Sequence, residues 1–281
     1  MLPNCVVIGG TRCGTTSLHY YLSLHPEICV SYPKELDFFI RDRNWQRGRG
    51  WYEAQFRAQP GVRACVECSP NYSLAPHFAG VPERMHGLLP HARLIYILRD
   101  PLARLISHHR QAVDHGAAPL DINTAIQDFG TSRFVLGSLQ HFQLSRYLEH
   151  YPLSRMLLLT SDDLARRRGP TLRRIFAFLG VDETFEEPRF DRVLNGSDSK
   201  RVKNGLGRML MKLVTIAGHP GRKIPPVIGQ PLRRLLLSPF SRPMPPIRLD
   251  PGMEQRLLEL FREDTARLRQ LTGLGLPGWC V

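Results

Sequence analysis

The sequence predicts an α/β protein in which a central parallel sheet is flanked by helices. Three apolar runs, Cys5 to Ile8, Arg93 to Leu98 and Met156 to Leu159, each lead into a polar turn and then a helical pattern, which is typical of strand–turn–helix units. The second run is nearly continuous, as in a strand that is buried on both faces of a parallel sheet. We expect a single domain over residues 1–281, because this length and 42% hydrophobic residues can supply one sizeable core.

The first unit is the stretch CVVIGGTRCGTTSL, from Cys5 to Leu18. An apolar strand enters a turn in which Gly9, Gly10 and Gly14 let backbone N–H groups point into a concave loop. Hydroxyl side chains follow where the first helical turn offers unpaired N–H donors to a phosphate; they belong to Thr15, Thr16 and Ser17. The stretch therefore predicts a phosphate-binding loop, with an ordinary glycine-rich turn as the alternative.

The spacing Gly9-x4-Gly14 is that of a nucleoside triphosphate loop, but Thr15 and Thr16 stand where that motif has Lys and then Ser or Thr. A basic residue appears three positions earlier, as Arg12. One cation over the loop favours a donor with a single 5′-phosphate-like group over ATP. A P-loop-type nucleotide kinase or NTPase remains an alternative, although it requires the missing lysine.

Charged and aromatic residues stand side by side in YPKELDFF, from Tyr32 to Phe39. Such a setting desolvates a carboxylate and raises its proton affinity. Glu35 is therefore a candidate general base, and Lys34 is a candidate cation beside it. A solvated loop with a Phe-Phe anchor is the alternative.

The rest of the amino-terminal half continues the alternation of helices and strands. We expect a first helix from Leu18 to about His25, a short strand over 28–30, a basic loop with a short amphipathic helix over 41–62, and a strand from Ala64 toward Glu67. A polar turn, Cys68 to Tyr72, follows that strand at the sheet edge where α/β sites gather.

Arg99-Asp100-Pro101 ends the strand Arg93 to Leu98, and helical periodicity resumes from Leu102 to Val113. Ser107 lies two turns beyond Arg99, so the guanidinium and the hydroxyl can bind a second phosphate together. The alternative is a surface ion pair between Arg99 and Asp100.

In the carboxyl-terminal half, the residues that mark the ends of helices and strands give weaker signals. We expect helices over 138–151, over Thr171 to Leu179 with Gly180 as a C-cap, and over Met253 to Leu271, after which Trp279 packs the tail. The segment from Asn195 to Arg208 is polar, basic and glycine-broken, as in a loop that closes over an anion. Residues 219–251 are rich in proline and basic residues, and we interpret them as an excursion from the domain.

The formal net charge is +13, which indicates an anionic partner such as a nucleotide, a nucleic acid, an acidic glycan or a membrane face. A basic nucleic-acid-binding protein is therefore the second alternative function. No apolar run approaches the roughly 20 residues of a membrane span, and no signal peptide is evident. We expect a cytoplasmic protein, with peripheral membrane association left open. Cys65-x2-Cys68 has no second Cys or His pair, so we expect reduced thiols and no metal.

Taken together, these motifs resemble the sulfotransferases that use 3′-phosphoadenosine 5′-phosphosulfate (PAPS), and among them bacterial relatives of the heparan sulfate 3-O- and N-sulfotransferases. GGTRCGTTSL is similar to the family's 5′-phosphosulfate loop, and LIYILRDPLARLISHHR to its 3′-phosphate segment, with Arg99 and Ser107 on matching positions. KELDFF is similar to a Lys-Glu-x-x-Phe-Phe stretch whose Glu is the catalytic base, which implicates Glu35. The resemblance covers nearly the whole chain and implies a P-loop-like sulfotransferase fold.

The resemblance implies transfer of a sulfuryl group to a hydroxyl, less readily an amine, of a carbohydrate or other small acceptor, without a metal. Glu35 would be the base, and Arg12 would stabilise the leaving group, adenosine 3′,5′-bisphosphate. Residues expected to bind the donor are Arg12, Cys13, Gly14, Thr15, Thr16, Ser17, Arg99, Ser107, Asn195, Ser197, Lys200, Arg201 and Lys203. Residues expected to bind the acceptor are Lys34, Asp37, Glu67 and Tyr72. The identity of the acceptor and the oligomeric state are not specified by the sequence, and no nucleic acid is expected.

Three departures from the family pattern matter. Arg12 replaces the usual lysine, Asp37 stands where the glycan enzymes commonly have histidine, and Cys68 where they commonly have lysine. Arginine keeps the charge but changes its reach and geometry. The acceptor contacts of the family are therefore not inherited.

Overall fold

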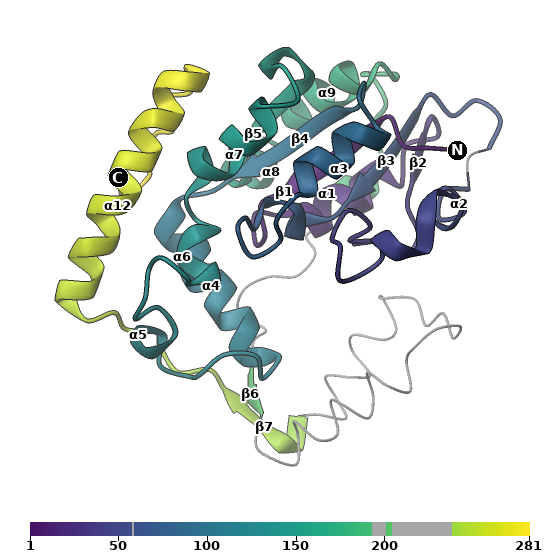
Figure 1. Ribbon diagram of the computed structural model, residues 1–281. Helices are drawn as coiled ribbons and strands as arrows, with labels where there is room; N and C mark the ends of the chain where they lie inside the picture. Colours follow the sequence, from purple (N-terminus) through teal and green to yellow (C-terminus); the bar gives the residue numbers. More distant parts are fainter. Residues whose placement is uncertain (58, 193–200, 204–237) are drawn as a thin grey trace.

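A five-stranded, all-parallel sheet forms the centre of the computed structural model, which describes residues 1–57, 59–192, 201–203 and 238–281 (Figure 1). The strand order is β2-β3-β1-β4-β5, and every neighbouring pair is parallel. The strands are β1 (Cys5–Gly9), β2 (Ile28–Val30), β3 (Ala64–Cys68), β4 (Arg93–Leu98) and β5 (Met156–Thr160). This sheet confirms the predicted fold class.

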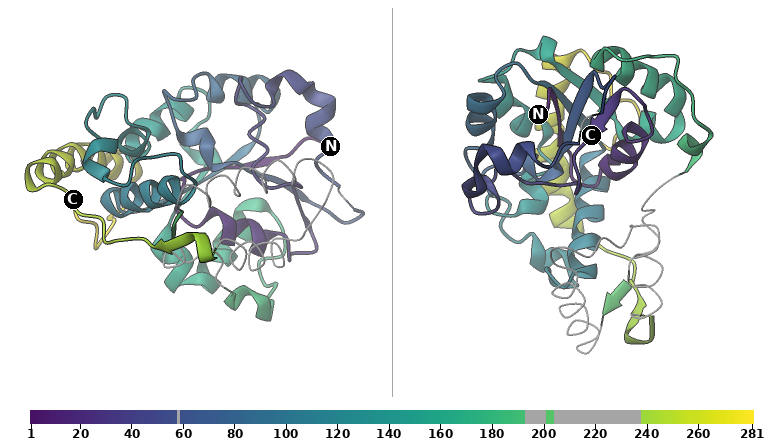
Figure 2. Two further views of the ribbon diagram at one scale, coloured as in Figure 1. Left: turned by 90° about the horizontal axis from the view of Figure 1, so that it is seen from below. Right: turned by 90° about the vertical axis from the view of Figure 1, so that its right-hand side faces the viewer.

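Helices cover both faces of the sheet, as the side views in Figure 2 show. The helices are α1 (Thr15–Leu22), α2 (Gly48–Glu53), α3 (Val81–Leu88), α4 (Pro101–Asp114), α5 (Ile122–Ala125), α6 (Arg133–Leu136), α7 (Gln140–Leu148), α8 (Ser161–Arg166), α9 (Arg168–Leu179) and α12 (Pro251–Thr272). A second, antiparallel pair of strands joins β6 (Arg201–Lys203) to β7 (Ser241–Pro243), and β6 contacts α4.

Alternation along the strands divides the core into two layers. In β1, Val6 and Ile8 pack on one face with residues of α2, α3 and α7. Cys5 and Val7 pack on the other face with residues of α1, α8 and α9. Successive side chains of a strand point to opposite faces, so one buried strand supports both layers.

The five predicted strands are all present, and the predicted helices over 102–113, 138–151, 171–179 and 253–271 correspond to α4, α7, α9 and α12. Trp279 packs against the core as predicted. The short helices α3, α5, α6 and α8 were not predicted, because four to eight residues carry little periodicity. No described helix combines the length and the apolar character that a bilayer crossing requires.

Two predicted segments lie wholly or partly outside the described residues. The basic segment from Asn195 to Arg208 is described only at residues 201–203, and the excursion over 219–251 only from residue 238 onward. The described end of the excursion contains a 3₁₀ turn, Ser238–Phe240, and strand β7.

Helix α12 packs against α7 and supplies the missing cap of its first turn. The Asp264 carboxylate accepts hydrogen bonds from the backbone N–H groups of His141 (2.9 Å) and Phe142 (3.0 Å). Leu139, at the N-cap position of α7, makes no side-chain capping bond. Burial raises the pKa of Asp264, against the effect of the two N–H donors. A residue more than a hundred positions away thus completes the helix end.

We expect Asp264→Ala to lower the free energy of unfolding by roughly 1 to 3 kcal/mol, because it leaves two N–H donors without an acceptor. Glu263→Ala is the matched control on the same helix: it removes only an exposed pair with Arg267, which contributes about 0.5 kcal/mol or less. Urea unfolding of the two variants measures the difference. Equal losses would show that the cap does not contribute.

Candidate active site

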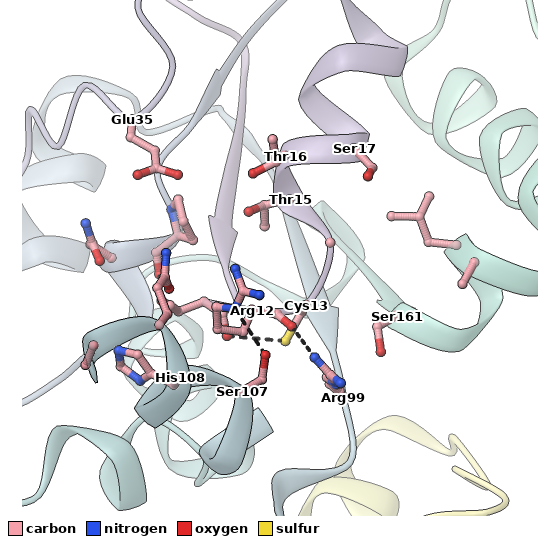
Figure 3. Close-up of a pocket in the computed structure, with 18 of the residues that line it drawn as sticks. Arg12, Cys13, Thr15, Thr16, Ser17, Glu35, Arg99, Ser107, His108 and Ser161 are labelled. Carbon is pink, nitrogen blue, oxygen red and sulfur yellow. Dashed lines mark hydrogen bonds between the residues drawn. The ribbon is translucent and has the colours of Figure 1, made fainter. Parts of the chain in front are cut away.

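A cleft of about 530 Å³ opens at the carboxyl ends of β1 and β4 (Figure 3). The loop after β1, the start of α1, the middle and the end of α4, the start of α8 and the Glu35 segment all line it. It brings together nine of the residues predicted for the site: Arg12, Cys13, Gly14, Thr15, Thr16, Ser17, Glu35, Arg99 and Ser107.

The loop after β1 is shaped by left-handed backbone. Gly14 has φ 97° and Arg12 has φ 70°, and such conformations let neighbouring N–H groups converge on an anion. The Gly10 N–H donates to the Ile97 carbonyl of β4 (2.9 Å), which fixes the loop to the sheet. A Cβ at Gly9 would lie 2.0 Å from Ser73 Oγ, so a side chain cannot be accommodated there. No side chain of the described residues caps the start of α1, which leaves its first N–H groups available to a ligand.

Arg12 and Arg99 place two positive charges in the cleft. Arg12 Nε donates to Ser107 Oγ (3.1 Å), and Arg99 Nη1 donates to the Arg12 carbonyl (2.7 Å). Burial lowers the pKa of Arg12, and the neighbouring Arg99 lowers it further. Within the described part of the chain, neither arginine takes part in a salt bridge. Both charges are therefore left for an anionic ligand.

The predicted alternative, an ion pair between Arg99 and Asp100, is wrong. Asp100 caps α4 by accepting from Ala103 N (2.7 Å), and it also accepts from Cys280 N (2.7 Å). The Gln140 side chain holds the Arg99 backbone, accepting from its N–H (2.9 Å) and donating to its carbonyl (2.7 Å). The Arg99 guanidinium is thus directed to the loop.

A third guanidinium lies beneath the loop. Arg104 of α4 is fully buried, and its Nε would lie 3.7 Å from a Cβ at Gly10. Its Nη1 donates to Ser138 Oγ (3.0 Å), whereas Nε and Nη2 find no acceptor among the described residues. Burial lowers the pKa of Arg104. This buried cation adds to the positive potential behind the loop.

Glu35 faces the same cleft from the segment that follows β2 (Figure 3). Its backbone has φ 62°, its N–H donates to the Cys68 carbonyl (3.1 Å), and its carboxylate pairs with Lys34. The side chain is 44% exposed, so the predicted desolvation by neighbouring aromatic rings is wrong: Phe38 and Phe39 turn into the core. The carboxylate is open to a substrate.

Asp37, Glu67 and Tyr72 require a correction, because the structure does not bring them to the cleft as acceptor ligands. Asp37 is buried, pairs with Arg43 and accepts from Asn71 Nδ2 (3.0 Å). Glu67 is fully buried, and burial raises its pKa. It accepts hydrogen bonds from the hydroxyls of Tyr52, Ser69 and Tyr72. Lys34 reaches the site only through its pair with Glu35.

The Glu67 network supports the Glu35 segment instead. Ser69 Oγ accepts from the backbone N–H of Asp37 (3.0 Å), and the Tyr72 hydroxyl accepts from that of Phe39 (3.3 Å). The same two hydroxyls donate to Glu67 (2.6 Å each). The buried carboxylate thus fixes the backbone two residues beyond Glu35.

Several cleft residues were missed from the sequence. His108 is buried, lines the cleft and has an Nδ1 atom without a partner among the described residues. Its pKa is held well below the usual value, by burial first and by Arg104 next, so the ring is neutral. Asn71 lies in the predicted polar turn after β3, whereas Arg133 carries no local signal. The start of α8 contributes Ser161 and Asp162, and a neighbouring wall is formed by Arg168.

The remaining donor residues predicted from the sequence cannot be compared with the cleft. Asn195, Ser197 and Lys200 lie outside the described residues, and Arg201 and Lys203 belong to strand β6. In the described ranges, no cluster of His, Cys, Asp and Glu is arranged to hold a metal ion.

Comparisons with known proteins point to one family. The model of the sulfotransferase domain matches residues 2–205. Heparan sulfate glucosamine 3-O-sulfotransferase 6 of Mus musculus is 26% identical over 255 residues, which cover 85% of this chain and 70% of that protein. Bifunctional heparan sulfate N-deacetylase/N-sulfotransferase 2 of Homo sapiens is 28% identical over 265 residues, covering 86% of this chain but only 28% of that protein. The chain thus spans little more than a quarter of the bifunctional enzyme.

Solved structures show the same fold. The sulfotransferase from Alicyclobacillus acidocaldarius superposes with a TM-score of 0.69 at 21% identity, over 99% of both chains. The sulfotransferase domain of the Synechococcus PCC 7002 olefin synthase gives 0.53 at 18% identity, over 94% of both chains. These likenesses establish a P-loop-like architecture. Because the domain model covers well over half of the sequence, the chain belongs to the sulfotransferase family.

Proposed function

We propose that this sulfotransferase transfers the sulfuryl group of PAPS to a hydroxyl, less readily an amine, of a carbohydrate or other small acceptor. One observation carries the proposal: a single cleft holds the cationic loop with Arg12 and Arg99 and, facing them, the open carboxylate of Glu35. We also propose that residues 1–281 act as one domain in the cytoplasm.

The residues of the cleft fit the donor. The loop N–H groups, Arg12 and the start of α1 suit the 5′-phosphosulfate. Arg99 and Ser107 suit the 3′-phosphate, because a guanidinium and a hydroxyl can both donate to one phosphate. Arg12 Nε contacts Ser107 Oγ directly, which links the two anion sites.

The donor supplies an activated sulfuryl group, and the protein supplies the base and the charge stabilisation. Glu35 would accept the proton of the acceptor hydroxyl as its oxygen attacks sulfur. The bond from sulfur to the 5′-phosphate oxygen breaks, and negative charge grows on that phosphate. Arg12 and the loop N–H groups would stabilise this charge, as preorganised donors do in related transfers. Lys34 would orient Glu35 through the ion pair.

The acceptor class follows from the named relatives only in part. Their names include both O- and N-sulfotransferases of heparan sulfate, so hydroxyl and amine acceptors are both represented. Asn71, Arg133 and His108 line the cleft beside the predicted reaction centre and would contact the acceptor. A screen of carbohydrate and small-molecule hydroxyl compounds with PAPS and mass spectrometry would identify it.

Adenosine 3′,5′-bisphosphate is expected to raise the melting temperature, because a ligand that binds only the folded state stabilises it by mass action. ATP with magnesium should shift it far less, since the loop has Thr15 where nucleoside triphosphate loops have the lysine that contacts the β- and γ-phosphates. Differential scanning fluorimetry measures both shifts. Equal stabilisation by ATP would contradict the donor assignment and favour the kinase alternative. No stabilisation by the bisphosphate would also contradict the donor assignment.

Arg99→Ala and Ser107→Ala should both weaken binding of the bisphosphate, with the larger loss for arginine. Hydrogen bonds to charged groups contribute roughly 1.5 to 3 kcal/mol, which corresponds to a 10- to 150-fold change in affinity. Isothermal titration calorimetry with the bisphosphate and with adenosine 5′-monophosphate measures the dependence on the 3′-phosphate. If wild-type protein binds both nucleotides equally, these residues do not recognise a 3′-phosphate.

Glu35→Gln should leave donor affinity near the wild-type value and lower kcat about 10²- to 10⁴-fold, the usual contribution of a general base. The matched control is Asp162→Asn, which changes an exposed carboxylate of the same cleft. Turnover with a fixed acceptor separates the two. An active Glu35→Gln variant together with an inactive Asp162→Asn variant would assign the base to the other carboxylate.

A further inference from the structure

A pair of cysteines at the edge of the sheet lies outside the cleft and has no part in the proposed reaction. Cys29 is the middle residue of the edge strand β2, and Cys65 lies directly opposite it on β3. Directly opposed residues of neighbouring strands point to the same face, and both side chains pack in the same core cluster. Burial raises the pKa of the Cys65 thiol, and the adjacent Cys29 thiol raises it further.

The strand register places the two backbones at a spacing that suits a disulfide. Neighbouring strands lie about 4.8 Å apart, and disulfides join Cα atoms about 4.4 to 6.8 Å apart. Both residues are free thiols in this structure.

The two thiols differ in access. Cys29 lines a surface cavity of about 260 Å³, together with Tyr32 and Arg57, and it is 8% exposed, whereas Cys65 is 0% exposed. Arg57 adds a positive charge to this cavity. Burial raises the pKa of Cys65, which keeps that thiol protonated. An oxidant in the cavity therefore meets Cys29 first, with Cys65 behind it.

We propose that Cys29 and Cys65 are a reversible oxidation site in which Cys29 reacts with a peroxide and Cys65 resolves the product. Hydrogen peroxide converts the Cys29 thiol to a sulfenic acid and releases one water. The Cys65 sulfur then attacks the sulfenic sulfur, the S–S bond forms, and the hydroxyl leaves with the Cys65 proton as a second water. The two thiols lose two electrons and two protons, and the peroxide is reduced to water.

The bond would act on the segment that carries Glu35. Beyond β2, Ser31 N donates to the Val66 carbonyl of β3 (3.1 Å), and Glu35 N donates to the Cys68 carbonyl at the end of β3 (3.1 Å). Backbone hydrogen bonds thus attach the segment from Cys29 to Glu35 to strand β3. A covalent link at its origin restrains the local opening of an edge strand of only three residues.

The test uses the full chain with Cys280→Ser, because Cys280 is the exposed cysteine. After peroxide treatment we expect an intact mass lower by two hydrogens, a peptide map that joins Cys29 to Cys65, and reversal by dithiothreitol. Amide exchange over residues 29–35 should slow in the oxidised form. Cys65→Ser should stop at a sulfenic acid on Cys29 that dimedone traps, and Cys29→Ser should form no link.

Oxidation of Cys280 in the unsubstituted chain shows that the peroxide is active. If the same peroxide treatment leaves the mass of the Cys280→Ser chain unchanged, or links another pair such as Cys5 and Cys68, the proposal is overturned. The peptide map of the chain that retains both Cys29 and Cys65 shows whether the link forms, even if Cys29→Ser or Cys65→Ser fails to fold. Because binding of adenosine 3′,5′-bisphosphate is measured in the reduced protein, failure here leaves the proposed function unaffected.

Discussion

The structure depends on holding three guanidinium groups around one loop although like charges repel. Each of these arginines directs a hydrogen bond to a neutral oxygen: Arg99 to the Arg12 carbonyl, Arg12 to Ser107 Oγ and Arg104 to Ser138 Oγ. Carboxylate partners would neutralise the charges and reduce the attraction for an anion. Among the described residues none of the three arginines forms a salt bridge. This arrangement is unfavourable without ligand and favourable once an anion lies in the loop.

A second buried charge sets the position of the proposed base. Glu67 was expected at the acceptor, yet three hydroxyl donors surround it in the core. Two of these hydroxyls, those of Ser69 and Tyr72, also accept from the backbone of the Glu35 segment. The buried carboxylate of Glu67 therefore fixes the segment that presents the exposed Glu35, in addition to the hydrogen bond that Glu35 N–H donates to the Cys68 carbonyl.

The sequence was sufficient for the sheet and for the centre of the cleft, because both depend on local patterns. In a parallel sheet the turns after the strands meet at one edge, so Arg12 and Arg99 could both be placed at that edge because each follows a predicted strand. The burial of Glu67 and Tyr72 could not be predicted, since it depends on the packing of α2 against β3. Arg133 was missed for a different reason: it reaches the cleft from the short helix α6, whose four residues show no periodicity.

A chain of contacts connects the cleft to the last described helix. Asp264 of α12 binds the first turn of α7, Gln140 begins α7 and holds the backbone of Arg99, and Arg99 contacts the loop. Strand β1 and the loop precede α12 in the chain and therefore emerge from the ribosome before it. Domains generally fold from the amino terminus during synthesis, but this cleft gains its full support only after α12 has been translated. The cleft of a nascent chain is therefore incomplete while α12 is still being translated, although its central loop has already been made.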